Sequence, residues 1–243
     1  MTTLILGASA GLGRELARQF AARQHRLLLI ARDAADLEAE AKHLRLVYGA
    51  EVEFVAADAA DPVALTRLLS ALACAPTIRN LCFPVGLTIE PDDGLLPAPE
   101  TVALVNANLT SIMAVTALFL PAMLQADRGN IIGFGSVAAI RGRRANIVYA
   151  AAKRGLESYF ESLRHRLAAT GVEVQFYRLG YVATRMTYGK TLLFPAATPE
   201  AVARRVLRGL DRDIPLTHIP GFWAGIGAVV RALPWSLYRR LDF

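Results

Sequence analysis

Ser136, Tyr149 and Lys153 are the residues whose types and spacing could carry out proton transfer. Residues four apart on a helix share a face, so Tyr149 and Lys153 would project to the same side of one helix. A phenol has an ordinary pKa of about 10, and an ammonium group beside it favours the phenolate and lowers that pKa towards neutrality. Such a tyrosine could give a proton to a carbonyl oxygen and take it back. The Ser136 hydroxyl could hold the same oxygen.

The segments around these residues predict how they are brought together. A strand over Asn130–Gly135 would deliver Ser136, and a helix that begins at about Asn146 would carry Tyr149 and Lys153. The Tyr-x-x-x-Lys spacing by itself is common by chance, so a solvated helix face is the alternative interpretation. The choice between the two depends on the rest of the chain.

A glycine-rich turn follows the first predicted strand. Thr2–Leu6 has the pattern of a short buried strand, Gly7, Gly11 and Gly13 lie in the turn, and a helix then runs to about Arg23. Glycine lets backbone amides approach a phosphate closely, and the N-terminus of the helix supplies partial positive charge. A glycine turn between a strand and a helix indicates a dinucleotide site.

The end of the second predicted strand, Arg26–Ala31, bears on the choice of cofactor. Many NAD-binding units have an acidic residue there for the ribose 2′-hydroxyl. Here the strand ends in alanine and Arg32 follows, which favours the 2′-phosphate of NADP, with NAD as the alternative. Arg14 is a candidate for a second phosphate contact. The other interpretation of Arg32 is a surface arginine before a helix N-cap at Asp33.

Strands alternate with helices along the chain, which predicts a single Rossmann-type α/β domain over residues 1–221. Its doubly wound parallel sheet would have about seven strands, with helices on both faces. The predicted strands are Thr2–Leu6, Arg26–Ala31, Glu51–Ala57, Arg79–Phe83, Asn130–Gly135, Val172–Leu179 and Ile214–His218. A long helix over Glu100–Gln125 contains Asn106 and Asn108. Asparagine is a poor residue for a helix interior, so at least one of them is expected to have another role.

Length and composition argue against several function classes. The 243 residues fit one large domain, and 54% of them are hydrophobic. The net charge of +6 admits an anionic partner, but the basic residues are spread along the chain, which argues against nucleic acid. Cys74 and Cys82, with four histidines, make no disulfide framework and no metal site. Without a signal peptide or an apolar run of about 18 residues, the expected location is the cytoplasm.

The C-terminal tail, residues 222–243, combines aromatic, aliphatic and basic side chains. An apolar stretch over Phe222–Val230 precedes Trp235, Tyr238 and a pair of arginines. This composition fits a helix that lies in a membrane interface. The alternative is a C-terminal element that packs on the domain or in a dimer.

Three arginines lie just before the tyrosine helix: Arg141, Arg143 and Arg144. A guanidinium pairs well with phosphate or carboxylate, so these side chains are candidates for binding an anionic group of a substrate. An ordinary solvated loop is the alternative.

With these pieces placed, the chain resembles the short-chain dehydrogenases/reductases over almost its whole length. The residues that match the family are Gly7, Gly11, Gly13, Asp58, Asn108, Ser136, Tyr149 and Lys153. The resemblance implies an NAD(P)-dependent oxidoreductase that reduces a ketone to a secondary alcohol. Tyr149 would be the acid, Lys153 would hold the nicotinamide ribose, and Ser136 would position the carbonyl. Asn108 would support a water through which the lysine is reprotonated.

The same resemblance implies a set of cofactor-binding residues. They are Gly7, Ser9, Gly11, Leu12, Gly13, Arg14, Arg32, Asp58, Gly86, Tyr149, Lys153, Gly180, Val182 and Thr184. Two segments depart from the family pattern. Phe83-Pro84-Val85-Gly86 replaces Asn-Asn-Ala-Gly, and Leu179 precedes Gly180 where the family has proline. These departures affect sheet stability and the nicotinamide wall, and they remove no proton-transfer group.

A narrower similarity, over residues 138–188 and the tail, is to the keto-reductase components of decaprenylphosphoryl-ribose 2-epimerases. It implies a keto-sugar substrate on a polyprenyl phosphate, and a tail that contacts the inner face of the membrane. The implied substrate-binding residues are Arg141, Arg143, Arg144 and Arg185. The alternatives are a reductase of another lipid or small-molecule ketone, and a non-catalytic nucleotide-binding protein. The family also implies a homodimer or homotetramer, for which Phe160 and Leu163 are candidate contacts.

Overall fold

The computed structural model describes residues 1–73, 78–185, 187–189, 192–214 and 216–241, and Cys74 lies outside this part. Its strands are β1 (Thr2–Leu6), β2 (Arg26–Ala31), β3 (Val52–Ala56), β4 (Ile78–Phe83), β5 (Gly129–Ser136), β6 (Val172–Leu179) and β7 (Thr217–Ile219). They form one parallel sheet in the order β3-β2-β1-β4-β5-β6-β7. The predicted fold class is confirmed.

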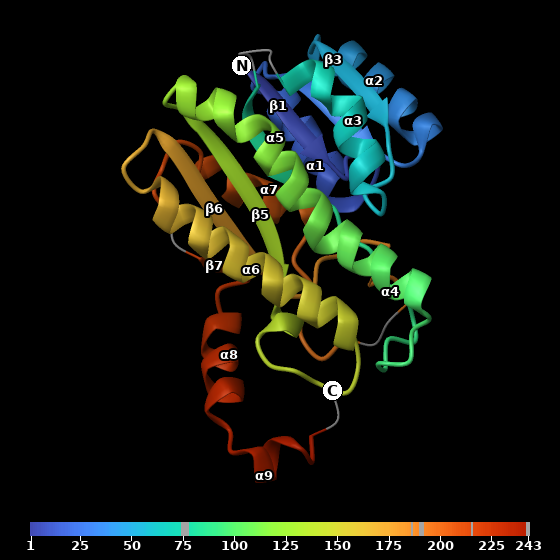
Figure 1. Ribbon diagram of the computed structural model, residues 1–243, viewed down its shortest axis with the longest axis vertical. Coiled ribbons are helices and arrows are strands. Elements are labelled where there is room, and N and C mark those ends of the chain that lie inside the picture. The colour runs from blue at the N-terminus through green and yellow to red at the C-terminus, as the bar shows by residue number, and fades with distance from the viewer. Residues whose placement is uncertain (74–77, 186, 190–191, 215, 242–243) are drawn as a thin grey trace.

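Helices cover both faces of this sheet (Figure 1). One core contains side chains of α1 (Gly11–Ala21), α2 (Ala34–Tyr48) and α7 (Pro199–Arg208). The opposite core contains side chains of α3 (Pro62–Ala73), α5 (Ser111–Gln125) and α6 (Ile147–Leu167). Strands buried on both sides have continuous apolar sequences such as that of β2, because neither face meets water. The strand order reverses between β1 and β4, which is where open α/β sheets bind ligands.

Side-chain caps fix where several helices begin. Asp33 accepts a hydrogen bond from the Asp36 amide at 3.0 Å, Asp61 accepts from the Ala64 amide at 3.0 Å, and Thr198 accepts from the Ala201 amide at 3.2 Å. Each cap satisfies an amide that has no partner within its own helix. Asp33 is therefore the N-cap of α2, as the sequence predicts.

The predicted long helix is divided by a wider turn. Helix α4 (Ala98–Val105) leads into a π-helical turn, η1 (Asn106–Thr110), and α5 follows. Both asparagines of this region lie in the π-helical turn. The stretch Ala98–Gln125 is long and apolar enough to cross a membrane, but 44% of its most apolar window is buried. Its buried side chains, such as Ile112, Val115 and Phe119, belong to the core on one face of the sheet.

The tail forms α8 (Trp223–Ala232) and α9 (Trp235–Tyr238), which extend from one end of the sheet (Figure 1). Trp223 and Tyr238 are each 6% exposed and attach the tail to the domain. Gly227 lies against Ile140, since a Cβ there would come within 2.8 Å of that side chain. The opposite side of the tail exposes apolar side chains, including Val229 at 62% and Trp235 at 67%.

Phe160 faces the core and is not available for a contact between subunits. Its side chain is 1% exposed. The ring lies over Gly133 of β5, where a Cβ would come within 2.5 Å of it. It also packs against the Phe176 ring, with the two centroids 5.2 Å apart. The prediction of Phe160 as an oligomer contact is therefore wrong, because the sheet-facing side of α6 takes this residue.

Candidate active site

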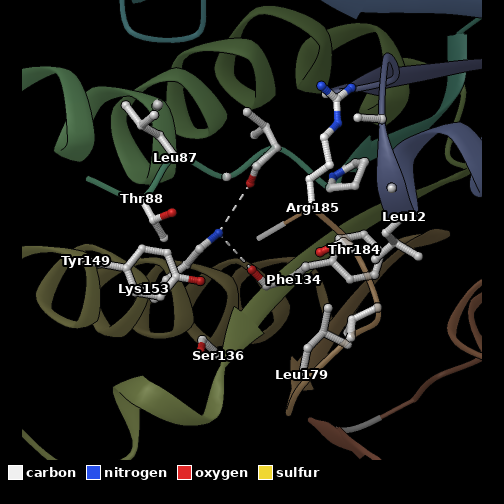
Figure 2. A pocket seen from close by; sticks show the side chains of 18 of the residues that line it. Leu12, Leu87, Thr88, Phe134, Ser136, Tyr149, Lys153, Leu179, Thr184 and Arg185 are labelled. Carbon is white, nitrogen blue, oxygen red and sulfur yellow. Dashed lines mark hydrogen bonds between the residues drawn. The ribbon is translucent and has the colours of Figure 1, made fainter. Parts of the chain in front are cut away.

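Tyr149 and Lys153 point to the same side of α6, as their spacing predicts (Figure 2). The Lys153 Nζ lies 5.9 Å from the centroid of the Tyr149 ring. Lys153 is 3% exposed, and its ammonium donates to the Val85 carbonyl at 3.3 Å and the Phe134 carbonyl at 3.2 Å. The two acceptors lie just after β4 and near the end of β5, so the edge of the sheet holds the lysine in place.

Ser136 stands at the carboxyl end of β5, beside the tyrosine helix (Figure 2). Its Oγ accepts a hydrogen bond from the Ala138 amide at 3.1 Å. Ser136, Tyr149 and Lys153 line one cavity of about 560 Å³. The three residues predicted to transfer and hold a proton therefore meet at the rim of the sheet.

Asp92 fixes the start of the tyrosine helix, and the sequence analysis did not find it. Its carboxylate accepts from the Val148 amide at 3.0 Å and the Tyr149 amide at 2.9 Å. Asp92 is 5% exposed, and Asn146, at the cap position of α6, makes no side-chain cap. A carboxylate at a helix N-terminus satisfies unpaired amides and the helix dipole. Asp92 thus positions Tyr149 through its backbone.

The glycine turn lies in the same cavity and fits a dinucleotide phosphate. Gly7 has a φ of +98°, and a Cβ there would come within 2.7 Å of the Val85 backbone. Helix α1 begins at Gly11 with no side-chain cap and no acidic residue in its first turn. Backbone amides at an uncapped helix N-terminus suit an anion. The close approach of the Val85 segment also explains why only glycine fits at position 7.

Arg32 and Asp58 line the cavity at the ends of β2 and β3. Their side chains are 3.9 Å apart, and that of Arg32 is 76% exposed. Arg14 is placed differently from its prediction as a phosphate contact. It donates to the Ser9 carbonyl at 2.5 Å and pairs with Glu40 at 3.3 Å, and it does not line the cavity. Arg14 therefore supports the glycine turn from outside the cavity.

Most of the other predicted cofactor residues line this cavity: Ser9, Gly11, Leu12, Gly86, Gly180, Val182 and Thr184. Gly13 does not line it and instead packs inside the turn. Gly180 has a further reason to be glycine, because a Cβ there would come within 1.9 Å of the Trp223 indole nitrogen. The first residue of α8 therefore packs directly against the wall of the cavity.

Comparison with known proteins agrees with this geometry. The sequence pattern described as short chain dehydrogenase matches residues 1–191. The chain belongs to the short chain dehydrogenase family. It is 33% identical, over 98% of its length and 96% of the other protein, to an uncharacterized oxidoreductase of Mycobacterium tuberculosis. It is 29% identical to the ketoacyl reductase HetN of Nostoc, over 86% of this chain and 75% of that protein.

A solved structure extends the similarity to three dimensions. A short-chain dehydrogenase from Sphingobium yanoikuyae in complex with NADPH superposes with a TM-score of 0.84 and 26% identity. The match covers 99% of this chain and 96% of that one. This short chain dehydrogenase is accordingly an NAD(P)-dependent oxidoreductase, and the residues of its glycine turn fit that cofactor.

The Tyr149 phenol has a raised pKa, which corrects the direction that the sequence predicts. Burial raises the pKa of Tyr149, while the Ser136 hydroxyl and the positive charge of Arg143 lower it less strongly. Lys153 is not among the groups that lower this pKa in the dehydrogenase. The phenol therefore stays protonated at neutral pH, which is the form that a proton donor needs.

Asn108 is fully buried and does not line the cavity. Its Nδ2 donates to the Leu87 carbonyl at 2.8 Å, and its Oδ1 accepts from the Leu87 amide at 3.3 Å. Leu87 lies in the segment after β4 that lines the cavity (Figure 2). The Asn108 side chain therefore positions the segment that contains Leu87. Asn108 itself lies in the π-helical turn.

The four predicted substrate arginines are not equivalent. Arg141 donates to the Val230 carbonyl at 2.8 Å, and Arg144 donates to the Arg239 carbonyl at 3.0 Å, so both bind the tail and neither lines the cavity. Arg143 and Arg185 do line it. Arg185 is 80% exposed and lies 3.7 Å from Asp36.

The rate of the NAD(P)-dependent reaction is expected to fall as the pH rises through about 8. Burial lowers the pKa of Lys153 to about 8, so the lysine is charged below that pH and neutral above it. Because the charged form is the one that binds an oxygen-rich cofactor, kcat/KM with the reduced cofactor should be level near pH 7 and decline above pH 8. A pH profile of kcat/KM tests this. A profile that stays level to about pH 10, the ordinary lysine value, would contradict it.

Proposed function

We propose that this short chain dehydrogenase is an NADPH-dependent reductase of a ketone. The observation that supports the proposal most is that Ser136, Tyr149 and Lys153 share one cavity with the glycine turn. A binding protein has no need of a protonated phenol beside a buried ammonium. Perturbed titratable groups that converge in a cavity are typical of catalytic sites.

In this mechanism the nicotinamide, when bound, supplies a hydride to the ketone carbon. The Ser136 hydroxyl donates a hydrogen bond to the ketone oxygen and holds it towards Tyr149. The Tyr149 hydroxyl donates its proton to that oxygen as the alcohol forms. Lys153, held by two carbonyls of the sheet edge, would bind the nicotinamide ribose. The amides that line the glycine turn would hold the diphosphate.

Replacing Arg32 by glutamine is expected to weaken NADPH binding by about 10- to 100-fold and to leave NADH binding nearly unchanged. The guanidinium would pair with the 2′-phosphate that only NADPH carries, and a charge-assisted contact of this kind contributes about 1.5–3 kcal/mol. The measurement is Kd for both cofactors. Arg128→Gln, a change at an exposed arginine outside the cavity, is the control. An unchanged ratio of the two Kd values would rule out Arg32 as the selecting residue.

The finer proposal for the substrate is a keto-sugar carried on a polyprenyl phosphate. It is supported by the exposed aromatic and aliphatic side chains of the tail, which suit a membrane interface, and by the narrower sequence similarity. A second candidate is a 3-oxoacyl thioester. It is supported by relatives named ketoacyl reductase HetN and, from Anas platyrhynchos, very-long-chain 3-oxoacyl-CoA reductase, which is 26% identical over 84% of this chain.

The test is oxidation of NADPH in the presence of a panel of ketones, with and without anionic vesicles. The panel contains a keto-pentose on a short polyprenyl phosphate, acetoacetyl-coenzyme A and a bulky neutral ketone. Turnover of any ketone supports the reductase, and the preferred one selects between the two substrate classes. Failure with every ketone would favour a nucleotide-binding protein without catalysis.

The same proposal includes a cytoplasmic homo-oligomer whose tail touches the membrane. Tail binding is supported by arginines that flank the exposed side of α9, since Arg239 and Arg240 lie next to the exposed Leu237 and Leu241. Sedimentation with anionic vesicles tests the membrane contact, and sedimentation velocity tests the oligomeric state.

A further inference from the structure

We propose that Arg143 binds an anionic group of the ketone substrate, next to Tyr149, and that the tail positions the loop that presents it. This inference deepens the proposed reductase function and rests on it. It assigns one of the four candidate arginines to the substrate and gives the substrate a chemical class: a ketone that carries a phosphate, a phosphodiester or a carboxylate.

Arg143 has a buried hydrogen-bond donor that none of the described residues satisfies. It lines the catalytic cavity together with Ser136, Ala138 and Tyr149. Its Nε is buried, and none of the described residues accepts a hydrogen bond from it. A buried donor without an acceptor costs free energy, and a charged donor costs more. An anion bound in the cavity would supply the missing acceptor.

In the described part of the chain, the cavity is lined by more cationic than acidic side chains. Its acidic lining residues in the described part of the chain are Asp58 and Glu90. Asp58 pairs with Arg32, where the strands β2 and β3 end. Glu90 also has an interaction partner and is not free. Arg143 lines the cavity together with Ser136 and Tyr149, and its positive charge acts to lower the pKa of the Tyr149 phenol. The described lining therefore has an excess of positive charge, with Arg32, Arg143, Lys153 and Arg185 against these two carboxylates.

The tail holds the loop on both sides of Arg143. Arg141 donates to the Val230 and Leu233 carbonyls, and its guanidinium lies 4.0 Å from the centroid of the Tyr238 ring. The Tyr238 hydroxyl donates to the Gly142 carbonyl at 2.7 Å. Arg144 reaches the tail as well. The neighbours of Arg143 are thus bound to α8 and α9, while Arg143 itself lines the cavity.

A phosphate and a carboxylate offer the same acceptor chemistry, so the test compares matched pairs of ketones. The pairs are dihydroxyacetone phosphate with dihydroxyacetone, 4-oxopentanoate with its methyl ester, and acetoacetyl-coenzyme A with the neutral acetoacetyl-N-acetylcysteamine thioester. The last pair tests whether the anion that Arg143 binds is part of the carrier of an acyl thioester. Each pair is assayed by NADPH oxidation with the full-length wild type and with Arg143→Gln, Arg143→Lys and the exposed control Arg166→Gln.

The expected result is a preference of the wild type for the anionic member of at least one pair, by about 10- to 100-fold in kcat/KM. Arg143→Gln should remove that preference, so that kcat/KM for the anionic member falls to about that for the neutral member. Arg143→Lys should keep part of the preference, and Arg166→Gln should keep all of it. Equal rates for both members of every pair in the wild type, or a preference that survives in Arg143→Gln, would overturn the proposal.

A second measurement distinguishes failure of the proposed reductase function from failure of the anion site. If the wild type reduces no ketone, binding of the same anionic ketones to the NADP-saturated protein is measured instead, by calorimetric titration. Binding that is lost in Arg143→Gln and kept in Arg166→Gln would support the anion site without reduction. No binding to the wild type at millimolar concentration would overturn the anion site as well. Thermal melting of each variant shows whether its fold is intact.

Discussion

Replacing Tyr149 by phenylalanine is expected to reduce ketone reduction by at least about 10³-fold while NADPH binding stays nearly unchanged. The substitution removes the hydroxyl that protonates the ketone oxygen, and positioned general acids contribute about 10²–10⁴-fold. The ring remains, so the packing of α6 is retained. The measurements are kcat for a ketone from the panel and Kd for NADPH.

The matched control is Tyr159→Phe in the same helix. The Tyr159 hydroxyl interacts with Thr116 and does not line the cavity, so its loss should leave kcat within about twofold, as expected for a group that takes no part in the chemistry. If Tyr149→Phe retains more than about a tenth of the wild-type kcat, another group protonates the oxygen, and the mechanism proposed above is wrong.

The meeting of Ser136, Tyr149 and Lys153 in one cavity could be predicted because their relation is local. Tyr149 and Lys153 share a face of one helix, and Ser136 ends a strand whose carboxyl edge is where a parallel sheet binds ligands. The glycine turn is equally local, since strand, turn and helix are consecutive. Spacing within one element or between consecutive elements can be read from a sequence without knowing the packing.

Asp92 could not be predicted, because its partners are distant in the chain. It lies in an irregular loop and binds the Tyr149 amide across 57 residues. The sequence offers only a weak signal, an asparagine before the helix, which is a residue type that tolerates positive φ. The structure shows that Asn146 has a φ of +57° and leaves the helix without a side-chain cap of its own. A carboxylate in a nearby loop is then the natural substitute, but several loops have one.

The partners of the three arginines could not be predicted either, because these partners are also distant in the chain. A sequence shows that Arg141, Arg143 and Arg144 are cationic, but it does not show which of them find partners in the tail, which folds back from 89 or more residues away. The pKa of Tyr149 was mispredicted for a related reason. The neighbouring charge is visible in the sequence, whereas the burial that outweighs it depends on the complete fold.

Replacing Gly13 by alanine is expected to weaken NADPH binding by more than tenfold and to destabilise the fold by about 1–3 kcal/mol, the usual cost of overpacking. A Cβ at position 13 would lie 1.9 Å from the Gly7 carbonyl oxygen and 3.1 Å from the Ala8 Cα. Both neighbours are backbone atoms, so the turn itself must move, and the amides that would hold the diphosphate move with it. Calorimetric Kd for NADPH and the free energy of unfolding in urea measure the two effects.

Gly225→Ala is the control that separates a specific clash from a general effect of the substitution. Gly225 lies in α8, and a Cβ there would meet nothing within 4 Å. Alanine is the better helix former by up to about 1 kcal/mol, so this variant should be as stable as the wild type or more stable, with unchanged NADPH binding. If Gly13→Ala behaves like Gly225→Ala in both measurements, the tight turn is not what shapes the phosphate site. Loss of stability without loss of affinity would mean that the turn supports the fold alone and that the diphosphate is held elsewhere in the cavity.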